Sequence, residues 1–277
     1  MFNTDYLDNI FYIYPTREDA EKGNDVGASG FYVMVQSEVF HDARMHIYGV
    51  TNAHVIEQIK DSESDVAYVR TNLKDGGTTI DEIPADEWTL HPGGDDLAVY
   101  SWTPKFPLNI RAFDVNDFIS TELMERHGIG VGDHTTTVGR YSLHPGKLSN
   151  RPAVRFGRVS MTPHEPVRQS TRNSFEQESF LVETYSINGF SGSPVYLTVK
   201  ADGRINAPEP LQEGRTFLLG IDWGHFDFDG IVRTDPFTGR IHTPSGMMCV
   251  VPAWKLREML YLEDFVKERL RIDQNKT

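Results

Sequence analysis

The sequence predicts an all-β fold, built as a sandwich or as barrels, with a helix near its end. Short strand-like runs recur along all 277 residues, and turn residues separate them. Several runs alternate apolar and polar residues, as a sheet with one buried face requires. Helical spacing of apolar residues is confined to two stretches, so βαβ units are not expected.

Ten runs carry the strand pattern, in two groups along the chain. They are 30–36, 45–51, 65–70 and 97–102, and then 134–141, 153–161, 180–186, 193–199, 216–222 and 247–252. One helical stretch, 114–128, opens at Asp114 and ends at Gly128, and the other, 252–272, has Pro252 near its start. The first stretch is expected to link two β halves, residues 1–117 and 118–277.

Charge and composition exclude several classes of partner. Lys and Arg number 27 against 40 Asp and Glu, a net charge of −13, which repels nucleic acid and anionic membrane surfaces. No apolar run reaches the roughly 18 residues of a membrane span. The N-terminus lacks the basic region of a signal peptide. The single cysteine, Cys249, excludes an intramolecular disulfide and a multi-cysteine metal site, so a cytoplasmic setting is expected.

The stretch GFSGSP (189–194) is either an ordinary turn before a strand or a loop that presents a reactive Ser191. Gly, Ser and Pro are common turn residues, so the stretch alone does not decide. A serine hydroxyl becomes a nucleophile only beside a base. Histidine is the usual base, and a carboxylate then holds its tautomer.

A candidate base and a candidate acid each stand next to a predicted strand. His54 follows an apolar strand in YGVTNAHVIEQ, although a lone histidine there is commonly structural. Asp96 directly precedes a strand in GGDDLAVYSW and is expected at the rim of a core, whereas Asp95 is expected to be solvated. The GDD sequence also occurs in polymerase metal sites, which need partner carboxylates and a basic channel that this acidic chain does not clearly offer.

Together, TNAHV, DDLAVY and GFSGSP resemble the trypsin-like (chymotrypsin-fold) serine proteases, most closely the bacterial HtrA/Deg-type branch. GASGFYVMV, GVGDHTTTVGRY with VRFGRVSM, LLGIDWG and CVVPAWKLREML extend the similarity to roughly residues 27–270. The resemblance implies two Greek-key β-barrels of the chymotrypsin type with a C-terminal helix. His54 and Asp96 would lie in the first and Ser191 in the second. Only 25 residues follow VVP, so no appended PDZ domain is expected.

The resemblance implies a serine endopeptidase that acts on protein or peptide substrates without cofactor or metal. Ser191 would attack, His54 would transfer the proton and Asp96 would orient His54, while the N–H groups of Gly189 and Ser191 would bind the oxyanion. Phe190 replaces the Asp that pairs with a newly cut N-terminus in digestive trypsins, so activation by propeptide cleavage is not expected. Alternatives are a catalytically inactive protease-fold binding module and an esterase on the same scaffold.

The same resemblance places the primary substrate pocket and predicts its preference. Its expected lining is Tyr185, Trp223, Gly224, Met247 and Met248. An aromatic residue at the pocket floor and flexible methionines favour small or medium apolar residues before the scissile bond. Glu183 and Asp222 lie close enough in sequence to enter the pocket instead, which would favour Lys or Arg.

Remaining motifs carry weaker expectations. HFDFDG (225–230) resembles a calcium loop, but its first position is His and no Glu closes it, so a hairpin loop is expected. Cys249, inside an apolar strand, is expected to be buried. No metal site is expected, because no i,i+4 or clustered partners accompany His46, His127, His134, His144 and His164.

Overall fold

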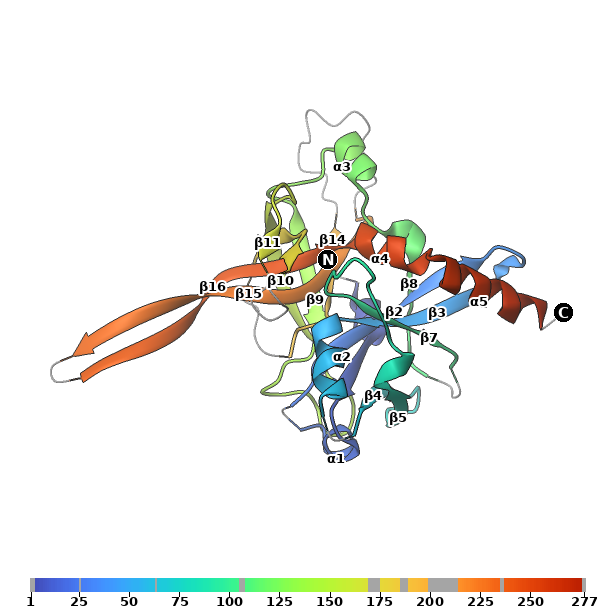
Figure 1. Ribbon diagram of the computed structural model, residues 1–277, viewed down its shortest axis with the longest axis horizontal. Helices are drawn as coiled ribbons and strands as arrows, with labels where there is room; N and C mark the ends of the chain where they lie inside the picture. Colours follow the sequence, from blue (N-terminus) through green and yellow to red (C-terminus); the bar gives the residue numbers. More distant parts are fainter. Residues whose placement is uncertain are drawn as a thin grey trace.

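The first half of the chain forms a curled sheet in the computed structural model (Figure 1). The structure describes residues 3–24, 26–62, 64–104, 108–168, 175–184, 189–198, 214–234 and 237–275. The strand order is β5–β4–β1–β2–β3–β7–β6, and β8 adds to β2 in parallel. The strands are β1 (Ile10–Tyr14), β2 (Ala28–Ser37), β3 (His41–Thr51), β4 (Val66–Asn72), β5 (Thr78–Pro84), β6 (Thr89–Leu90), β7 (Ala98–Trp102) and β8 (Phe113–Asp114).

The second half forms a closed barrel of six strands, ordered β10–β13–β16–β15–β14–β9. Closure leaves no edge at which the barrel strands lack a neighbour. A separate pair of short strands, β11 and β12, lies beside it. The elements are β9 (His134–Gly139), β10 (Ala153–Met161), β11 (Val167–Arg168), β12 (Glu176–Gln177), β13 (Phe180–Glu183), β14 (Pro194–Thr198), β15 (Thr216–Thr234) and β16 (Phe237–Pro252).

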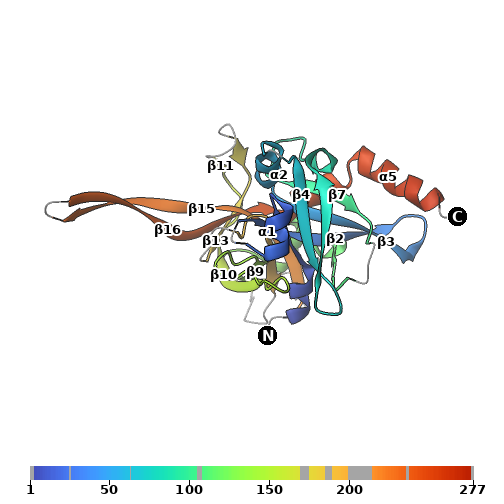
Figure 2. The same cartoon turned by 90° about the horizontal axis from the view of Figure 1, so that it is seen from below.

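A long two-stranded arm, formed by β15 and β16, projects from the barrel (Figures 1 and 2). The two strands stay in antiparallel register out to Thr234 and Phe237, with irregularities between Asp222 and Gly224 and between His225 and Asp227. The predicted strands 216–222 and 247–252 therefore extend much farther than expected. HFDFDG lies within β15 rather than in a hairpin loop, which corrects that expectation.

Strand β1, with the sequence IFYIY, lies outside the ten predicted runs. All five of its residues are buried. Polarity does not alternate along a strand with two buried faces, so the pattern that reveals half-buried strands is missing here. The predicted runs other than the two in the arm coincide with strands to within a few residues.

Helices occupy shorter segments than the apolar spacing predicted. The expected helix 114–128 is wrong in its first part, because Asp114 Oδ1 accepts from the Asn116 N–H and opens only a 3-10 turn. Helix α3 (Thr121–His127) begins after Ser120, whose Oγ accepts from the Leu123 N–H at 3.1 Å, and Gly128 ends it with φ 62°. The other helical elements are η1 (Thr4–Asn9), α1 (Arg17–Lys22), α2 (Ala53–Lys60), η2 (Ala85–Glu87) and η3 (Val115–Asp117).

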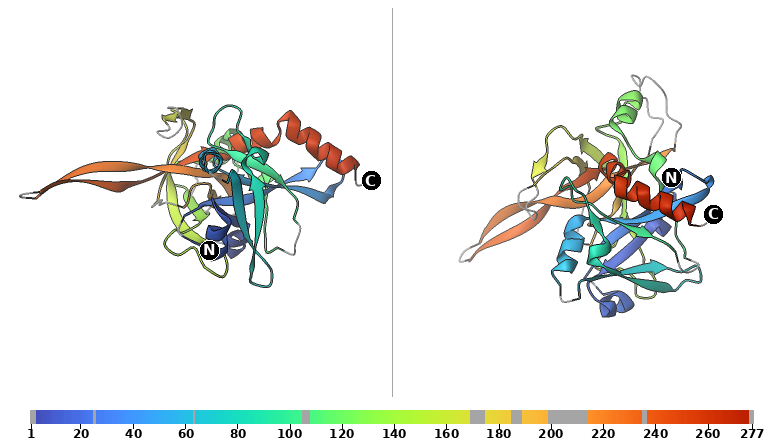
Figure 3. Two further views of the ribbon diagram at one scale, coloured as in Figure 1. Left: turned by 60° about the horizontal axis from the view of Figure 1, so that its bottom comes forward. Right: turned by 45° about the vertical axis from the view of Figure 1, so that its right-hand side comes forward.

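The expected helix 252–272 is two helices, α4 (Ala253–Leu260) and α5 (Glu263–Gln274). Helix α5 opens with Glu263 and Asp264, acids that the positive end of the helix dipole favours. It lies on the side of the molecule opposite the arm (Figures 1 and 3). There Asp273 of α5 accepts hydrogen bonds from Ser37 of β2 and Arg44 of β3.

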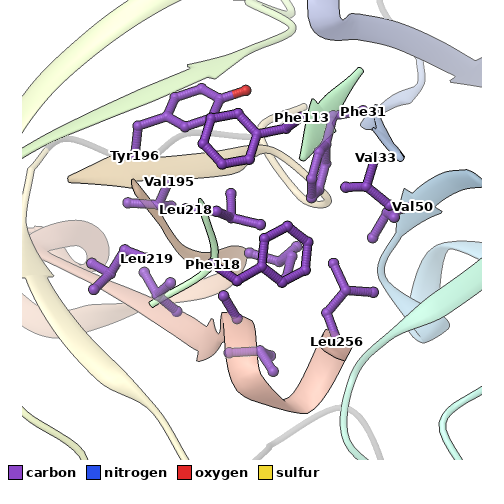
Figure 4. Packing of buried hydrophobic residues seen from close by; sticks show 14 of the residues in the cluster. Phe31, Val33, Val50, Phe113, Phe118, Val195, Tyr196, Leu218, Leu219 and Leu256 are labelled. Carbon is purple, nitrogen blue, oxygen red and sulfur yellow. The ribbon is translucent and has the colours of Figure 1, made fainter. Parts of the chain in front are cut away.

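One hydrophobic cluster runs through both halves, so their cores are continuous. Figure 4 shows Phe31 and Val50 of the first sheet close to Phe118 and to Leu218 of the barrel. The Ile119 N–H donates to the Leu218 carbonyl at 2.9 Å, which ties the connecting segment to the barrel.

The boundary between the two halves at residues 117 and 118 stays a prediction. Among the described helices, none is long and apolar enough to cross a membrane.

Candidate active site

His54 and Asp96 meet at the start of helix α2. The backbone N–H of His54 donates to Asp96 Oδ1 at 2.9 Å, and the ring Nδ1 of His54 lies 2.6 Å from Asp96 Oδ2. The preceding Asn52 makes no side-chain cap, so Asp96 satisfies an N–H of the first turn in its place. The His54 side chain is 17% exposed and that of Asp96 only 2%. Because the carboxylate holds Nδ1, Nε2 is the ring nitrogen that does not contact Asp96.

Two polar side chains fix the backbone of Asp96. Asn52 Nδ2 donates to the Asp96 carbonyl at 2.9 Å, and the Asp96 N–H donates to Gln177 Oε1 at 2.9 Å. Gln177 is fully buried and comes from β12, in the second half of the chain. The role of Gln177 was not predicted from the sequence, because no local pattern marks a residue whose hydrogen-bond partner lies 81 positions away.

Asp95 is buried, so the expectation of a solvated Asp95 is wrong. It is 5% exposed, and Gln177 Nε2 donates to its Oδ1 at 2.7 Å. His91 Nδ1 lies 3.1 Å and Lys255 Nζ 3.8 Å from its Oδ2. Burial lowers the pKa of His91, against the opposing effect of Asp95. Because Lys255 belongs to helix α4, this helix contributes a positive charge close to the buried Asp95 carboxylate.

The loop that carries Ser191 depends on two glycines. Gly189 has φ 98° and Gly192 has φ 83°, in the left-handed region that favours glycine. A Cβ on Gly192 would lie 2.2 Å from the Ser29 carbonyl oxygen and 2.4 Å from Thr51 Oγ1. Only glycine therefore lets the chain pass this close to the first half.

Hydrogen bonds from both halves hold this loop. The Ser29 N–H donates to the Ser191 carbonyl at 2.9 Å, and Ser29 Oγ donates to the Gly189 carbonyl at 2.7 Å. From the barrel, the Gly192 N–H donates to the Asp222 carbonyl and the Asp222 N–H to the Ser193 carbonyl, each at 2.9 Å. Ser29 sits in the GASGF segment, but its supporting role did not follow from that resemblance alone.

Ser191 and His54 line one cavity of about 360 Å³. Gly189 lines the same cavity, so the loop and the histidine face a shared space. Within the described residues, the N–H groups of Gly189 and Ser191 donate to no protein acceptor. The site therefore combines a hydroxyl, an imidazole held by a carboxylate, and two backbone donors.

The residues expected to line the primary pocket separate into different environments. Met247 lines a second cavity, of about 600 Å³, together with Glu183 and Gly246. Met248 is 1% exposed, and its Sδ lies 3.9 Å from Thr137 Oγ1 in the barrel core.

The other predicted pocket residues are Trp223 and Gly224, which follow Asp222 in β15, and Tyr185. Trp223 is half-buried and donates from Nε1 to Ser179 Oγ at 2.9 Å. A Cβ on Gly224 would meet no atom within 4 Å. Asp222 is 1% exposed, and its Oδ1 accepts from the Gly224 N–H at 3.1 Å. Tyr185 falls outside the described residues.

Neither metal ligands nor a reactive thiol were found in the described ranges. No group of three His, Cys, Asp or Glu residues that could hold an ion is present there. Cys249 is buried, and burial, with Asp222 adding to it, raises the pKa of its thiol to about 12. A thiol with so high a pKa is a poor nucleophile.

No protein-family model and no curated protein matches the chain, but solved structures do. The apo protease domain of MamO from Magnetospirillum magneticum is 16% identical with a TM-score of 0.51, covering 92% of this chain and 97% of that one. Deg5 is 16% identical, with a TM-score of 0.45 and coverage of 80% and 81%. The Rv3671c protease, in its inactive form, is 15% identical, with a TM-score of 0.45 and coverage of 92% and 88%. With its closed barrel, curled sheet and C-terminal helices, the chain has the chymotrypsin-like fold of trypsin-like protease domains.

Proposed function

We propose that this chain is a serine endopeptidase that hydrolyses peptide bonds through Ser191, His54 and Asp96. One observation carries the proposal. The ring of His54 is held 2.6 Å from a buried carboxylate, and the same histidine lines a cavity with Ser191. Such a hydroxyl, imidazole and carboxylate are the parts that acyl transfer requires.

In the proposed reaction, Ser191 Oγ attacks the substrate carbonyl while His54 Nε2 takes its proton. Asp96 keeps the ring in the required tautomer and stabilises the imidazolium that forms. His54 then donates the proton to the leaving amine, the C–N bond breaks, and an ester to Ser191 remains. A water, deprotonated by His54, hydrolyses this ester and restores the hydroxyl.

The oxyanion of each tetrahedral intermediate would be bound by the Gly189 and Ser191 N–H groups. Both donors lack a protein acceptor among the described residues, so they are available to a substrate. Backbone donors that are already in place need no reorganisation when the negative charge develops. The bonds from Ser29 and Asp222 supply this rigidity.

We further propose that the loop needs no activating cleavage. Phe190 is 1% exposed, and the Arg155 guanidinium lies 5.6 Å from the centre of its ring. A buried aromatic side chain anchors the loop where the digestive enzymes use an ion pair. Competence would then depend on packing within this chain.

The preference before the scissile bond is proposed to be small or medium apolar residues. Met247 beside the 600 Å³ cavity and the half-buried Trp223 support an apolar lining. Glu183 borders the same cavity and is the group that a Lys or Arg would need. A peptide library read by mass spectrometry separates the two, because strict cleavage after Lys or Arg would contradict the apolar preference.

Labelling with a fluorophosphonate probe tests the function directly. We expect stoichiometric modification of Ser191, no modification of Ser191→Ala, and cleavage of both peptide and ester substrates. A folded protein that resists the probe would support the rival interpretation, an inactive binding module. Cleavage of esters alone would identify an esterase.

The single cysteine supports a reducing, cytoplasmic setting for this activity.

A further inference from the structure

The cavity of about 360 Å³ extends well beyond Ser191 and His54, and the proposed reaction does not use the rest of it. One wall is formed by the end of β1 and the start of β2, including Ile13 and Ala28. Helix α2 forms another part of the lining, through Val55 and Ile59. These four side chains are at most 8% exposed, so the walls are already packed in place.

The chemistry of the site shows which part of a substrate this cavity would receive. The substrate oxygen binds at the Gly189 and Ser191 N–H groups, and His54 must reach the leaving amine. The leaving side therefore extends past His54, away from the acyl side. Apart from Gly189 and Ser191, the cavity is lined by His54 and other residues of the first half of the chain, whereas Trp223, Gly224 and Met247 are not part of its lining. It lies on the leaving side.

We infer that this cavity selects substrates with a large apolar residue, such as Leu, Met or Phe, directly after the scissile bond. The inference rests on the proposed endopeptidase function and specifies its substrate class. At about 30 Å³ per water, the cavity has the volume of roughly twelve water molecules, enough for a large side chain and part of the next residue. Val26, 61% exposed, adds an apolar residue at the rim.

A buried positive charge makes the cavity unfavourable for Lys and Arg. Arg140 is fully buried, and its Nη1 donates to the Gly27 carbonyl at 3.4 Å. Its guanidinium lies behind the cavity, because Cβ atoms added at Gly27 and Gly189 would come within 3.3 and 3.2 Å of it. Rings of Tyr12 and Tyr14 stack near it, and within the described residues no carboxylate pairs with it. A second cation placed close by would be repelled.

Capture of the acyl-enzyme by added amines measures this selection without involving the acyl-side pocket. An ester substrate first acylates Ser191, and then the amides of Leu, Phe, Ala and Lys compete with water. The amine nitrogen attacks the acyl carbon, the bond to Oγ breaks, and the amine proton passes through His54 to Oγ. Because this is the reverse of the acylation step, the amine occupies the leaving side.

We expect Leu and Phe amides to capture the acyl group about 10-fold or more better than Ala amide, as apolar pockets discriminate. Lys amide should be the weakest. Val26→Ser should reduce the ratio of Leu to Ala capture, and Ala28→Leu should reduce it further by filling the cavity. Val131→Ser, at a similarly exposed valine that does not line the cavity, is the matched control and should leave the ratio unchanged.

Fluorophosphonate labelling in parallel distinguishes a failure of this inference from a failure of the proposed function. Labelled enzyme with equal capture of Leu and Ala amides, or with Lys amide preferred, would overturn this inference and leave the endopeptidase proposal intact. Unlabelled but folded protein would overturn the proposed function and the inference with it. Because Val26 is a surface residue, its variant keeps the test valid even if Ala28→Leu does not fold.

Discussion

Among the His–Asp pairs of the described residues, His54–Asp96 and His46–Asp273 each have a serine nearby. In one, His54 and Asp96 are 2.6 Å apart beside the cavity that Ser191 lines. In the other, His46 Nε2 lies 3.2 Å from Asp273, where helix α5 packs on the first sheet. Similar residue types thus serve a proposed active site in one place and a structural anchor in the other.

The difference lies in what the serine and the carboxylate contact. Ser37 Oγ donates to Asp273 Oδ2 at 2.7 Å, so this hydroxyl is bonded to the acid and not to the base. Arg44 Nη1 donates to the other oxygen at 3.0 Å. Burial would raise the pKa of Asp273, but the hydrogen bonds from Ser37, His46 and Arg44 outweigh burial and lower it. The Asp273 carboxylate therefore has a structural role, joining helix α5 to strands β2 and β3.

Exposure separates the pairs further. The side chain of His46 is 7% exposed and that of His54 is 17% exposed. A base must reach a substrate, whereas an anchor gains strength from exclusion of water. Residue types alone therefore do not distinguish the two pairs, whereas the contacts and the exposure of their side chains do.

The largest expected effect separates the two serines. Ser191→Ala should abolish turnover, and His54→Ala should lower it by a factor on the order of 10³ or more, because they remove the proposed nucleophile and the proposed base. Ser37→Ala should leave turnover per folded molecule unchanged. Steady-state hydrolysis of a peptide or ester substrate measures all three. Comparable losses of turnover from Ser37→Ala and Ser191→Ala would contradict the different roles given to the two serines.

The next effect distinguishes the neighbouring acids. Asp96→Asn should reduce turnover by a factor on the order of 10³ or more, since an amide stabilises the wrong tautomer of His54. Asp95→Asn should act mainly on stability, because Asp95 contacts Lys255 and Gln177 rather than the imidazole of His54. Turnover and thermal unfolding of both variants would show this. A silent Asp96→Asn with a crippled Asp95→Asn would mean that the acid is misassigned.

Asp273→Asn should lower the free energy of unfolding by about 1–3 kcal/mol at pH 7, as charged hydrogen bonds are lost. Because the folded pKa of Asp273 is lowered, its contribution is complete above the unfolded value near 3.9. It is lost as the pH falls through the folded value. Urea unfolding of both proteins at several pH values should show the gap narrowing in acid. A gap that widens in acid would contradict the lowered pKa.

The smallest effect is expected from Ser37→Ala on stability, about 1 kcal/mol. Its Oγ donates to Asp273 and accepts from the Val39 and Phe40 N–H groups, so the turn between β2 and β3 should loosen. Amide exchange in that turn should accelerate while exchange in the barrel stays unchanged. Uniform acceleration throughout the molecule would instead show that Ser37 supports the fold as a whole.

The sequence predicted the elements whose patterns are local. Alternating strands and the glycines around Ser191 belong to this group, because burial of one face and a left-handed backbone leave marks in neighbouring residues. Gln177, Ser29 and the burial of Asp95 could not be predicted, since each depends on contacts between distant segments. Strand β1 was missed because both its faces are buried, and the arm because paired strands outside a core need no apolar pattern.

The arm has a consequence for the timescales of motion in this molecule. Beyond His225 and Gly246, within the described ranges, β15 and β16 pair only with each other, whereas the barrel strands have neighbours on both sides. Amide protons in the arm should therefore exchange by local fraying from its tip, while those near Leu218 wait for rarer openings of the barrel. The irregularities at 222–224 and 225–227 interrupt the regular β-pairing of β15 and β16 between the arm and the barrel. The arm and the barrel should thus open as two separate cooperative units.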